Sequence, residues 1–415
     1  MKWSQYGRTT LALVASLALG LSITACNPTF TLGYVYVLTT ATNPGLINAY
    51  TIDSASGAIT QVANSPFPSG GQYPIAGVVD NQNKWLYVIH EIDNTVVEFA
   101  IGIDGKLYQQ HTYNSPGTYP IAEAIDPSSK YLFVVDSYAP GFNGVAPPNI
   151  NPIASNTGPT QGCVVVYPIT PADGSLGSPV PDPTTGQSCF PIGAAPALGS
   201  QPISITATAS VDYLYVADQG THTVFAYSVN YGNGVLSPLP AANNSFQAGV
   251  KPSSILSSPN GHFVYVTDQS ANDMLGYTVQ SNGALLSMGQ PIPTDLFPNS
   301  MTMDPTGQFL YETNFNSNDV GVYSVNATTG VPTAIPSGSN YGTGTGPTCI
   351  VVEPAYGRFL YVSNFLSSSA SGFQLDPQNG SLVQVLNTPK PTNGEPSCVA
   401  AASNRTHPVS STATP

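Results

Sequence analysis

The sequence predicts an all-β protein in which seven four-stranded blades surround one axis as a β-propeller. A phrase built on "LYV" recurs seven times, with central aromatic residues spaced 51, 46, 82, 50, 46 and 50 residues apart. Six of these aromatics follow a proline by 13 or 14 residues. Only 7% of the 415 residues are charged, whereas 39 Gly, 39 Pro and 23 Tyr favour turns and strands. A period near 48 residues suits four short strands with their turns, so we expect almost no helix.

Each repeat has the same order of elements. A strand follows the proline, the aromatic phrase forms a second strand, and two further strands flank a Gly-marked turn. The first repeat lacks its proline strand, whereas "GEPSCVAAAS" at residues 394–403 supplies one with no aromatic phrase after it. We therefore predict that residues 396–402 complete the blade begun by residues 34–62, which closes the ring and removes exposed sheet edges. The predicted propeller spans residues 34–402.

The N-terminus has the features of an export signal. Lys2 and Arg8 precede the apolar run "TLALVASLALGLSI", which is too short to span a bilayer comfortably. The following "ITAC" resembles the lipobox of bacterial lipoproteins. That resemblance implies that residues 1–25 are removed and that Cys26 carries lipid; an ordinary signal with a chance cysteine is the alternative.

The residue after the lipobox bears on location. Asn27 replaces the Asp that the resemblance associates with inner-membrane retention. We therefore expect the protein in the cell envelope, lipid-anchored at the outer membrane or cell surface. Residues 26–33 would form a short tether, and residues 403–415 a disordered tail.

Charge restricts the class of partner. The formal net charge is −13 and the chain has no basic patch, which argues against nucleic acid binding. The expected partners are the membrane, through the lipid on Cys26, and a small-molecule or protein ligand. We expect a monomer.

Four cysteines remain after Cys26, and an even number in an exported protein suggests disulfides. Cys349 and Cys398 each stand two residues after a blade proline, in strands that neighbour each other in the predicted ring. We predict that they form a disulfide, and that Cys163 pairs with Cys189 across blade 3. Four free thiols are the alternative, while the lack of a C-x-x-C pair argues against zinc.

Blade 3 contains the main departure from the repeat. Residues 137–162 expand the turn between its second and third strands. Loops of this length are usually functional or disordered. Tyr138 and Phe142 in this loop are candidates to cover a ligand.

A polar residue stands three positions after each aromatic anchor. Such a ring of oxygen atoms could hold a divalent cation at the axis. Alternatively, these side chains cap the turns that follow them. The residues are Thr39, His90, Asp136, Asp218, Asp268, Asn314 and Asn364.

Four residues stand out because the turns do not require them. His90, Glu91 and His222 are the candidate catalytic residues, because acid–base chemistry needs such groups. Glu123 interrupts a row of otherwise apolar or small residues in the inner strands. Its carboxyl group is expected to titrate abnormally unless it is paired.

The repeat "P-x-x-h-x-h-x-P-x-G-x-[FY]-L-Y-V-x-[DN]", followed by "V-x-x-Y-x-h…G-x-L", resembles the seven-bladed lactonase family typified by bacterial 6-phosphogluconolactonase. It also overlaps the "YVTN" repeats of surface proteins. The resemblance implies a propeller that hydrolyses a lactone, and "IHEIDNTV" places Glu91 on the family glutamate. The family's "P-R-H" reads Pro74, Ile75 and Ala76 here. The cations that a phosphorylated lactone requires are therefore missing.

Two hypotheses of function follow. The first is a lipid-anchored binding or scaffold module with a degenerate lactonase site. The second is a hydrolase of a neutral lactone or ester at the propeller axis, with Glu91 and either His90 or His222 as acid–base groups and a divalent cation as a further candidate component.

Overall fold

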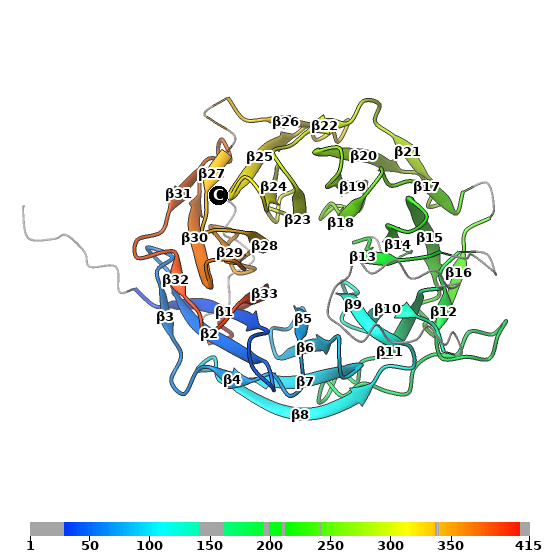
Figure 1. The fold of residues 1–415 in the computed structure, drawn as a ribbon, viewed down its shortest axis with the longest axis horizontal. Coiled ribbons are helices and arrows are strands. Elements are labelled where there is room, and N and C mark those ends of the chain that lie inside the picture. The colour runs from blue at the N-terminus through cyan, green and yellow to red at the C-terminus, as the bar shows by residue number, and fades with distance from the viewer. Residues whose placement is uncertain are drawn as a thin grey trace, which may run out of the picture. The chain divides into compact units, whose positions relative to one another are not determined.

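The computed structural model describes residues 29–140, 161–193, 199–209, 212–240, 243–336, 338 and 340–406. The predicted signal segment with Cys26, the loop residue Phe142 and the end of the predicted tail lie outside these residues. Internal contacts divide the chain into residues 1–30 and residues 31–415. The second unit consists of seven antiparallel sheets around one axis, which confirms the predicted propeller (Figure 1). Its described residues contain no helix, and so none that could span a membrane.

The inner strands surround the axis and begin at or just before the blade prolines. Proline is tolerated there because the first residue of a strand need not donate a ladder hydrogen bond. Most of their residues are partly exposed, as expected of strands that face the axis. The inner strands are β5 (Pro74–Val79), β9 (Thr118–Ile125), β13 (Pro202–Ala207), β18 (Pro252–Ser257), β23 (Pro298–Met303), β28 (Pro347–Val352) and β33 (Pro396–Ser403).

The second strands carry the aromatic anchors, all of which are fully buried. These strands have neighbours on both edges and packed sheets on both faces, so their sequences are nearly continuous apolar runs. They are β1 (Thr31–Thr39), β6 (Trp85–His90), β10 (Tyr131–Tyr138), β14 (Tyr213–Asp218), β19 (Phe263–Asp268), β24 (Phe309–Asn314) and β29 (Phe359–Asn364).

The third strands run antiparallel to the second strands and are also largely buried. In every blade except blade 2, the outer partners of these strands are shorter than the third strands themselves. They are β2 (Leu46–Asp53), β7 (Thr95–Ile101), β11 (Cys163–Pro168), β15 (Thr223–Val229), β20 (Asp273–Val279), β25 (Asp319–Val325) and β30 (Ser369–Leu375).

The outermost strand is broken into two short pieces in five of the seven blades. Short edge strands with polar, exposed residues reduce the risk of pairing with another chain. The outer pieces are β3 (Ile59–Gln61), β4 (Phe67–Pro68), β8 (Leu107–Asn114), β12 (Phe190–Pro191), β16 (Leu236–Pro238), β17 (Ser245–Gln247), β21 (Leu285–Ser287), β22 (Ile292–Pro293), β26 (Pro332–Ala334), β27 (Asn340–Gly342), β31 (Leu382–Gln384) and β32 (Lys390–Pro391).

The recurring tyrosines join neighbouring blades. In five blades the anchor hydroxyl donates a hydrogen bond to the carbonyl of a glycine in the next blade. Each of these glycines has a positive φ between 68° and 82°, a conformation that glycine adopts without steric cost. One such bond, from Tyr361 to Gly57 (2.7 Å), links the last blade to the first. The repeated Tyr and Gly therefore specify how blades dock, as well as the core.

The C-terminal strand closes the ring as predicted. Strand β33 pairs antiparallel with β1, with Val37 opposite Val399 and Gly33 opposite Ser403. Blade 1 thus takes its inner strand from the far end of the chain. Both edges of β1 are satisfied by this arrangement.

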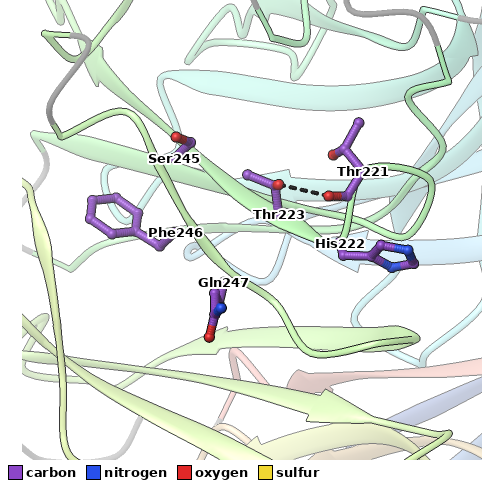
Figure 2. Close-up of a pocket in the computed structure, with 6 residues that line it drawn as sticks. All are labelled: Thr221, His222, Thr223, Ser245, Phe246 and Gln247. Atoms are coloured by element: carbon purple, nitrogen blue, oxygen red, sulfur yellow. Dashed lines mark hydrogen bonds between the residues drawn. The ribbon is translucent and has the colours of Figure 1, made fainter.

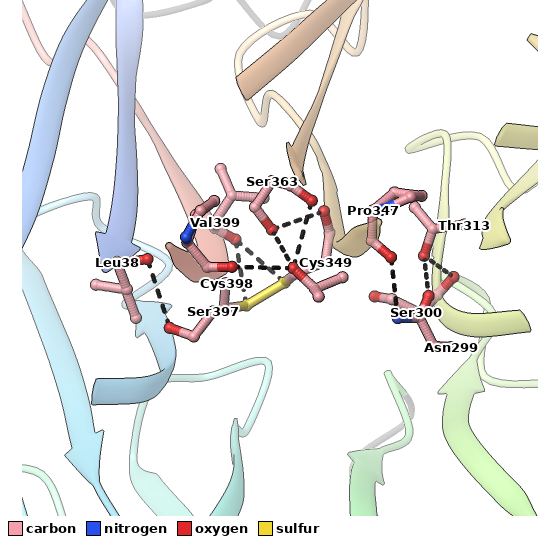
Figure 3. The surroundings of a disulfide bond; sticks show 12 residues. Leu38, Asn299, Ser300, Thr313, Pro347, Cys349, Ser363, Ser397, Cys398 and Val399 are labelled. Carbon is pink, nitrogen blue, oxygen red and sulfur yellow. Dashed lines mark hydrogen bonds between the residues drawn. A yellow bond between two sulfur atoms is a disulfide. The ribbon is translucent and has the colours of Figure 1, made fainter. Parts of the chain in front are cut away.

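Both predicted disulfides are present. Cys349 and Cys398 join the neighbouring inner strands β28 and β33, with Cα atoms 4.8 Å apart (Figure 3). Cys163 and Cys189 join β11 to the segment before β12, with Cα atoms 5.7 Å apart. Both Cα separations fall within the range of native disulfides.

Candidate functional site

The seven polar residues that follow the anchors are buried. Each lies opposite a blade proline in the strand ladder, and none is more than 1% exposed. The carboxylates among them accept hydrogen bonds from the loop of their own blade. Asp136, for example, accepts from Ser115 Oγ (2.6 Å) and the Gly117 N–H (3.0 Å). Capping of the adjacent loops accounts for these contacts.

The ring does not converge on a common ligand position. Among the described residues, one group of three His, Cys, Asp or Glu side chains brings its ligand atoms within 4.8 Å of one another. That group is Asp136 with Cys163 and Cys189, whose sulfur atoms are already joined to each other. The polar ring therefore supplies no cluster of carboxylates suited to a divalent cation within the described part of the chain.

His90 lies beneath the loop that precedes β5. Ser69 Oγ donates to the Gly71 carbonyl (3.0 Å), so it accepts the N–H of His90 Nε2 (3.0 Å). Burial lowers the pKa of His90 to about 4, against the opposing effect of Asp93. A Cβ atom at Gly71 would lie only 2.6 Å from the imidazole, which shows how closely the loop covers it. The structure places His90 as a neutral, enclosed side chain.

Glu91 lies at the end of the propeller where the inner strands begin. We call this end the proline end, and define it by the residues directly before the blade prolines together with their hydrogen-bonded partners. In six blades a backbone N–H donates to the carbonyl of the residue before the proline. The pairs are Thr40 to Glu395, Glu91 to Tyr73, Gln219 to Gln201, Gln269 to Lys251, Phe315 to Phe297 and Phe365 to Gly346.

The carboxyl group of Glu91 is partly buried and makes no hydrogen bond with the described residues. Burial raises its pKa above the ordinary value. The pKa values of Tyr73 and Tyr119 are raised by burial and, to a smaller extent, by the charge of Glu91. Tyr138 packs edge-on against Tyr119, with ring centroids 5.8 Å apart. Glu91 is thus an uncommitted carboxyl group among tyrosines.

Three aromatic residues of the proline end have left-handed backbone conformations. Tyr73, Tyr119 and Phe297 have φ values of 58°, 57° and 64°. Such values are outliers for bulky side chains, and they persist only where the surroundings impose them. The side-chain oxygens of Asn94 and Asn272, in the preceding blades, hold the N–H groups of Tyr119 and Phe297 at 2.7 and 2.8 Å. Neighbouring blades therefore position these aromatic residues.

The blade 5 and 6 side of the proline end has a different character. Lys251 Nζ lies 5.5 Å from the ring centroid of Phe297, a cation–π contact. Phe297 also packs against Phe315, with centroids 6.0 Å apart. Lys251 is the one cation directly before a blade proline, and no second cation stands beside it at an equivalent position.

The three candidate catalytic residues occupy separate environments. His222 is exposed in the turn between β14 and β15 of blade 4, whereas His90 and Glu91 belong to blade 2. The pKa of Glu91 is shifted by burial alone, with no contribution from a histidine. The structure therefore shows no paired acid and base formed by these side chains.

Glu123 lies on β9 opposite Val134. Both of its carboxyl oxygens are inaccessible and have no hydrogen-bond partner among the described residues. Burial raises the pKa of this group well above its ordinary range. The group is therefore a buried neutral acid in a row that is apolar elsewhere.

Some notable residues escaped the sequence analysis. Glu312 is buried on β24, where Tyr323 and Asn314 donate to its Oε1 (3.0 and 3.2 Å). Burial raises its pKa to about 8. Gly321 stands opposite, and a Cβ atom there would lie 2.6 Å from Glu312 Oε1. The sequence offered one indication of this site: a glutamate interrupts the apolar second strand of blade 6, and a glycine stands at the opposite position of the third strand.

The repeat geometry can now be compared with known proteins. Residues 236–352 match the family model Lactonase, 7-bladed beta-propeller. The resemblance to lactonase propellers predicted from the repeats is therefore confirmed. No curated protein matches the chain.

Solved structures similar to this lactonase-like propeller share little sequence with it. A candidate 6-phosphogluconolactonase of Bacteroides fragilis is 18% identical, with a TM-score of 0.69 over 90% of this chain and 98% of that one. The periplasmic gluconolactonase of Pseudomonas aeruginosa is 20% identical, with a TM-score of 0.68 over 90% and 99% of the two chains. Apo AztD of Citrobacter koseri is 15% identical, with a TM-score of 0.53 over 90% and 98%. At these identities the likeness shows the fold.

Proposed function

We propose that the protein is a lipid-anchored, extracytoplasmic propeller that binds a neutral ligand at the proline end and has a degenerate lactonase site. The observation that carries this proposal is the environment of Glu91. Its carboxyl group lies close enough to Tyr73 and Tyr119 to influence the pKa of both, and Tyr138 packs against Tyr119. Among the described residues, no cation affects the pKa of Glu91. Aromatic surfaces with a few polar groups are typical of small-molecule sites.

The missing cations argue against a phosphorylated substrate. Ile75 and Ala76 occupy the positions where the family resemblance calls for Arg and His, on the inner strand β5. Lys251 lies in blade 5 and is engaged with Phe297. Phosphate recognition normally relies on several convergent donors, which these residues do not provide.

Two observations support a location outside the cytoplasm. Disulfides persist in oxidising compartments outside the cytoplasm, and this chain contains two. One similar structure is that of a periplasmic gluconolactonase. The lipid on Cys26 and the outer-membrane or surface location rest on the lipobox resemblance. Labelling cells with radioactive palmitate, with Cys26→Ser as the control, tests the anchor.

Glu91 also favours a second candidate function, the hydrolysis of a neutral lactone. Burial raises the pKa of the Glu91 carboxyl group, and carboxyl groups with raised pKa values are common among acid–base catalysts. This alternative requires Glu91 to act without the enclosed His90 and without His222 of blade 4.

The deciding experiment measures turnover of 6-phosphogluconolactone and δ-gluconolactone by the purified protein and by Glu91→Gln. We expect no enzymatic turnover of either lactone by the protein. Glu395→Gln, at an exposed carboxylate of the same end, is the matched control. Hydrolysis of δ-gluconolactone that Glu91→Gln alone abolishes would establish the second function. Rapid hydrolysis of the phosphorylated lactone would overturn the proposal.

A further inference from the structure

The turn between the second and third strands ends in the same way in three blades. Its last residue is an asparagine with a positive φ of 54°, 56° or 60°. The asparagine Oδ1 accepts the N–H of the residue before the next blade's proline. The bonds are Asn94 to Tyr119 (2.7 Å), Asn272 to Phe297 (2.8 Å) and Asn318 to Gly346 (2.8 Å).

Blade 4 has His222 at this position, with a φ of 58°. Its backbone keeps the shared role, because its carbonyl accepts the N–H of Ala248 (3.0 Å) as the Asn272 carbonyl accepts that of Thr294 (3.0 Å). Its side chain does not. The N–H that the side chain would otherwise cap, that of Lys251, donates to Asp268 Oδ1 (3.1 Å).

The imidazole of His222 therefore has no structural task. It is exposed and makes no hydrogen bond with the described residues. In the other three blades the asparagine both adopts a positive φ and caps an N–H group of the next blade. At His222 the backbone needs the positive φ, but no N–H group needs the cap. An imidazole retained at an exposed position where the fold does not use it is a candidate for ligand contact.

His222 is one of the residues that line a pocket between this turn and the outer strand of blade 4 (Figure 2). Its other lining residues come from the same turn, from the start of β15 and from the outer piece β17. They are Thr221, Thr223, Ser245, Phe246 and Gln247. Thr223 Oγ1 donates to the Thr221 carbonyl (2.9 Å), which leaves its lone pairs available as acceptors.

The chemistry of this lining restricts the ligand. It contains no carboxylate, lysine or arginine, so it offers neither the oxygen cluster of a divalent cation nor the cations of a phosphate site. The hydroxyl protons of Thr221 and Thr223 are used within the protein, so these two groups offer a ligand acceptors. The Ser245 hydroxyl, the Gln247 amide and the imidazole can each donate and accept hydrogen bonds. Phe246 also lines the pocket, although its ring packs in part against the core. A neutral polyhydroxy ring, with alternating hydroxyl groups and C–H faces, complements such a surface.

We propose that the His222 pocket is a binding site for a neutral carbohydrate, separate from the ligand site at Glu91. The two sites lie on blades 4 and 2, so each can be disabled without altering the other. The inference goes beyond the proposed function, because it stands whether or not Glu91 binds or hydrolyses anything.

The test uses the imidazole itself as the reporter. The chain has five histidines, so in protein labelled with ¹³C-histidine the ring resonance of His222 is assigned by its loss in His222→Asn. That variant installs the residue that the repeat carries at this position, and it is expected to remain folded. The labelled protein is titrated with maltose, cellobiose and N,N′-diacetylchitobiose.

We expect at least one of the three sugars to shift the His222 resonance saturably. Gln247→Ala, at an exposed lining residue, should weaken that binding at least threefold, whereas Glu91→Gln should leave it unchanged. Calorimetry with His222→Asn should show at least a tenfold loss of affinity. Absence of a saturable shift with all three sugars, or unaltered affinity in His222→Asn, would overturn the proposal.

Discussion

The closure between blades 7 and 1 and the third blade each contain a disulfide, but the two bonds lie in different surroundings. Cys349 and Cys398 join inner strands of different blades, across 49 residues. Cys163 and Cys189 lie within one blade, across 26 residues, and both are fully buried. The first bond ties the last strand into the ring. The second holds a blade whose outermost strand, β12, has only two residues.

Blade 3 also places two buried acids close to its disulfide. Asp136 lies directly opposite Cys163 in the strand ladder, and Glu123 lies on the inner strand of the same blade. The closing strand β33 instead offers Cys398, Val399 and small alanines to its neighbours. The disulfide of the closure thus joins strands of small and apolar residues, whereas blade 3 combines its disulfide with buried carboxyl groups that reduce stability at neutral pH.

The largest expected effect is the loss of the closing disulfide. Replacing both Cys349 and Cys398 by serine should lower the free energy of unfolding by about 4 kcal/mol, because a loop of 49 residues is released in the unfolded chain. Urea denaturation followed by tyrosine fluorescence measures the change. A loss below about 1 kcal/mol would mean that the strand ladder of β33 closes the ring without help.

A smaller loss is expected from the blade 3 disulfide. Replacing Cys163 and Cys189 by alanine should lower the free energy of unfolding by about 3.5 kcal/mol, since the loop is shorter at 26 residues. Hydrogen exchange should increase mainly in β11 and β12, with β33 remaining protected. Equal loss of protection in β33 would contradict the view that the two disulfides stabilise separate regions.

Glu123→Met introduces the residue found in the same row of blade 6, Met301. We expect a gain of about 2 kcal/mol at pH 8, because a buried carboxyl group without partners is replaced by an apolar side chain. The pKa of Glu123 is raised in the folded state, so the wild-type protein loses stability as pH rises above the unfolded value of about 4.3.

The gain from Glu123→Met should therefore be smaller at pH 5 than at pH 8. Denaturant titrations at the two pH values measure both gains. Glu395→Met, which changes an exposed carboxylate, controls for the removal of charge. An equal gain at both pH values would show that Glu123 is ionised in the folded protein.

The smallest effect concerns Asp136, whose pKa burial raises to about 7 against the opposing hydrogen bonds from Ser115 and Gly117. The folded state then keeps its proton at pH values where the unfolded state has lost it. Wild-type stability should fall from about pH 4 to pH 7 and then level off. Between pH 6 and 8 the decrease due to this group is about 1 kcal/mol.

Asp136→Asn should remove that part of the pH dependence. Denaturation midpoints in urea, measured at intervals from pH 5 to 8, give the two profiles. Profiles with the same slope between pH 6 and 8 would show that Asp136 is not the group that titrates.

The ring architecture could be predicted because its determinants are local and repeated. The spacing of prolines and anchors revealed seven units, and the unpaired proline strand at Pro396 revealed how the ring closes. The small residues in the row of Cys349 and Cys398 also placed these two cysteines correctly. Each inference depended on comparing equivalent positions of the same chain.

The site was harder to predict because its geometry depends on neighbouring blades. Nothing in the residues around Tyr119 indicates a positive φ, since the cap on its N–H comes from Asn94 of the preceding blade. Sequence spacing also gives no sign that the Ser69–Gly71 loop encloses His90. Glu123 was the exception, because the equivalent position of every other inner strand holds an apolar or small residue, and this difference is visible in the aligned repeats.

The pairing of β33 with β1 also has a consequence for how the protein is made. Gly33 lies opposite Ser403, so the first strand of the propeller in the sequence is completed by the last. Contacts this distant in sequence make folding slow, because most of the chain must be ordered before they form. During that interval the edge of β1 that later pairs with β33 is open to other incompletely folded molecules of the protein. During folding, two processes therefore compete for the open edge of β1: pairing with the C-terminal strand β33, which completes the propeller, and pairing with another chain, which leads to aggregation.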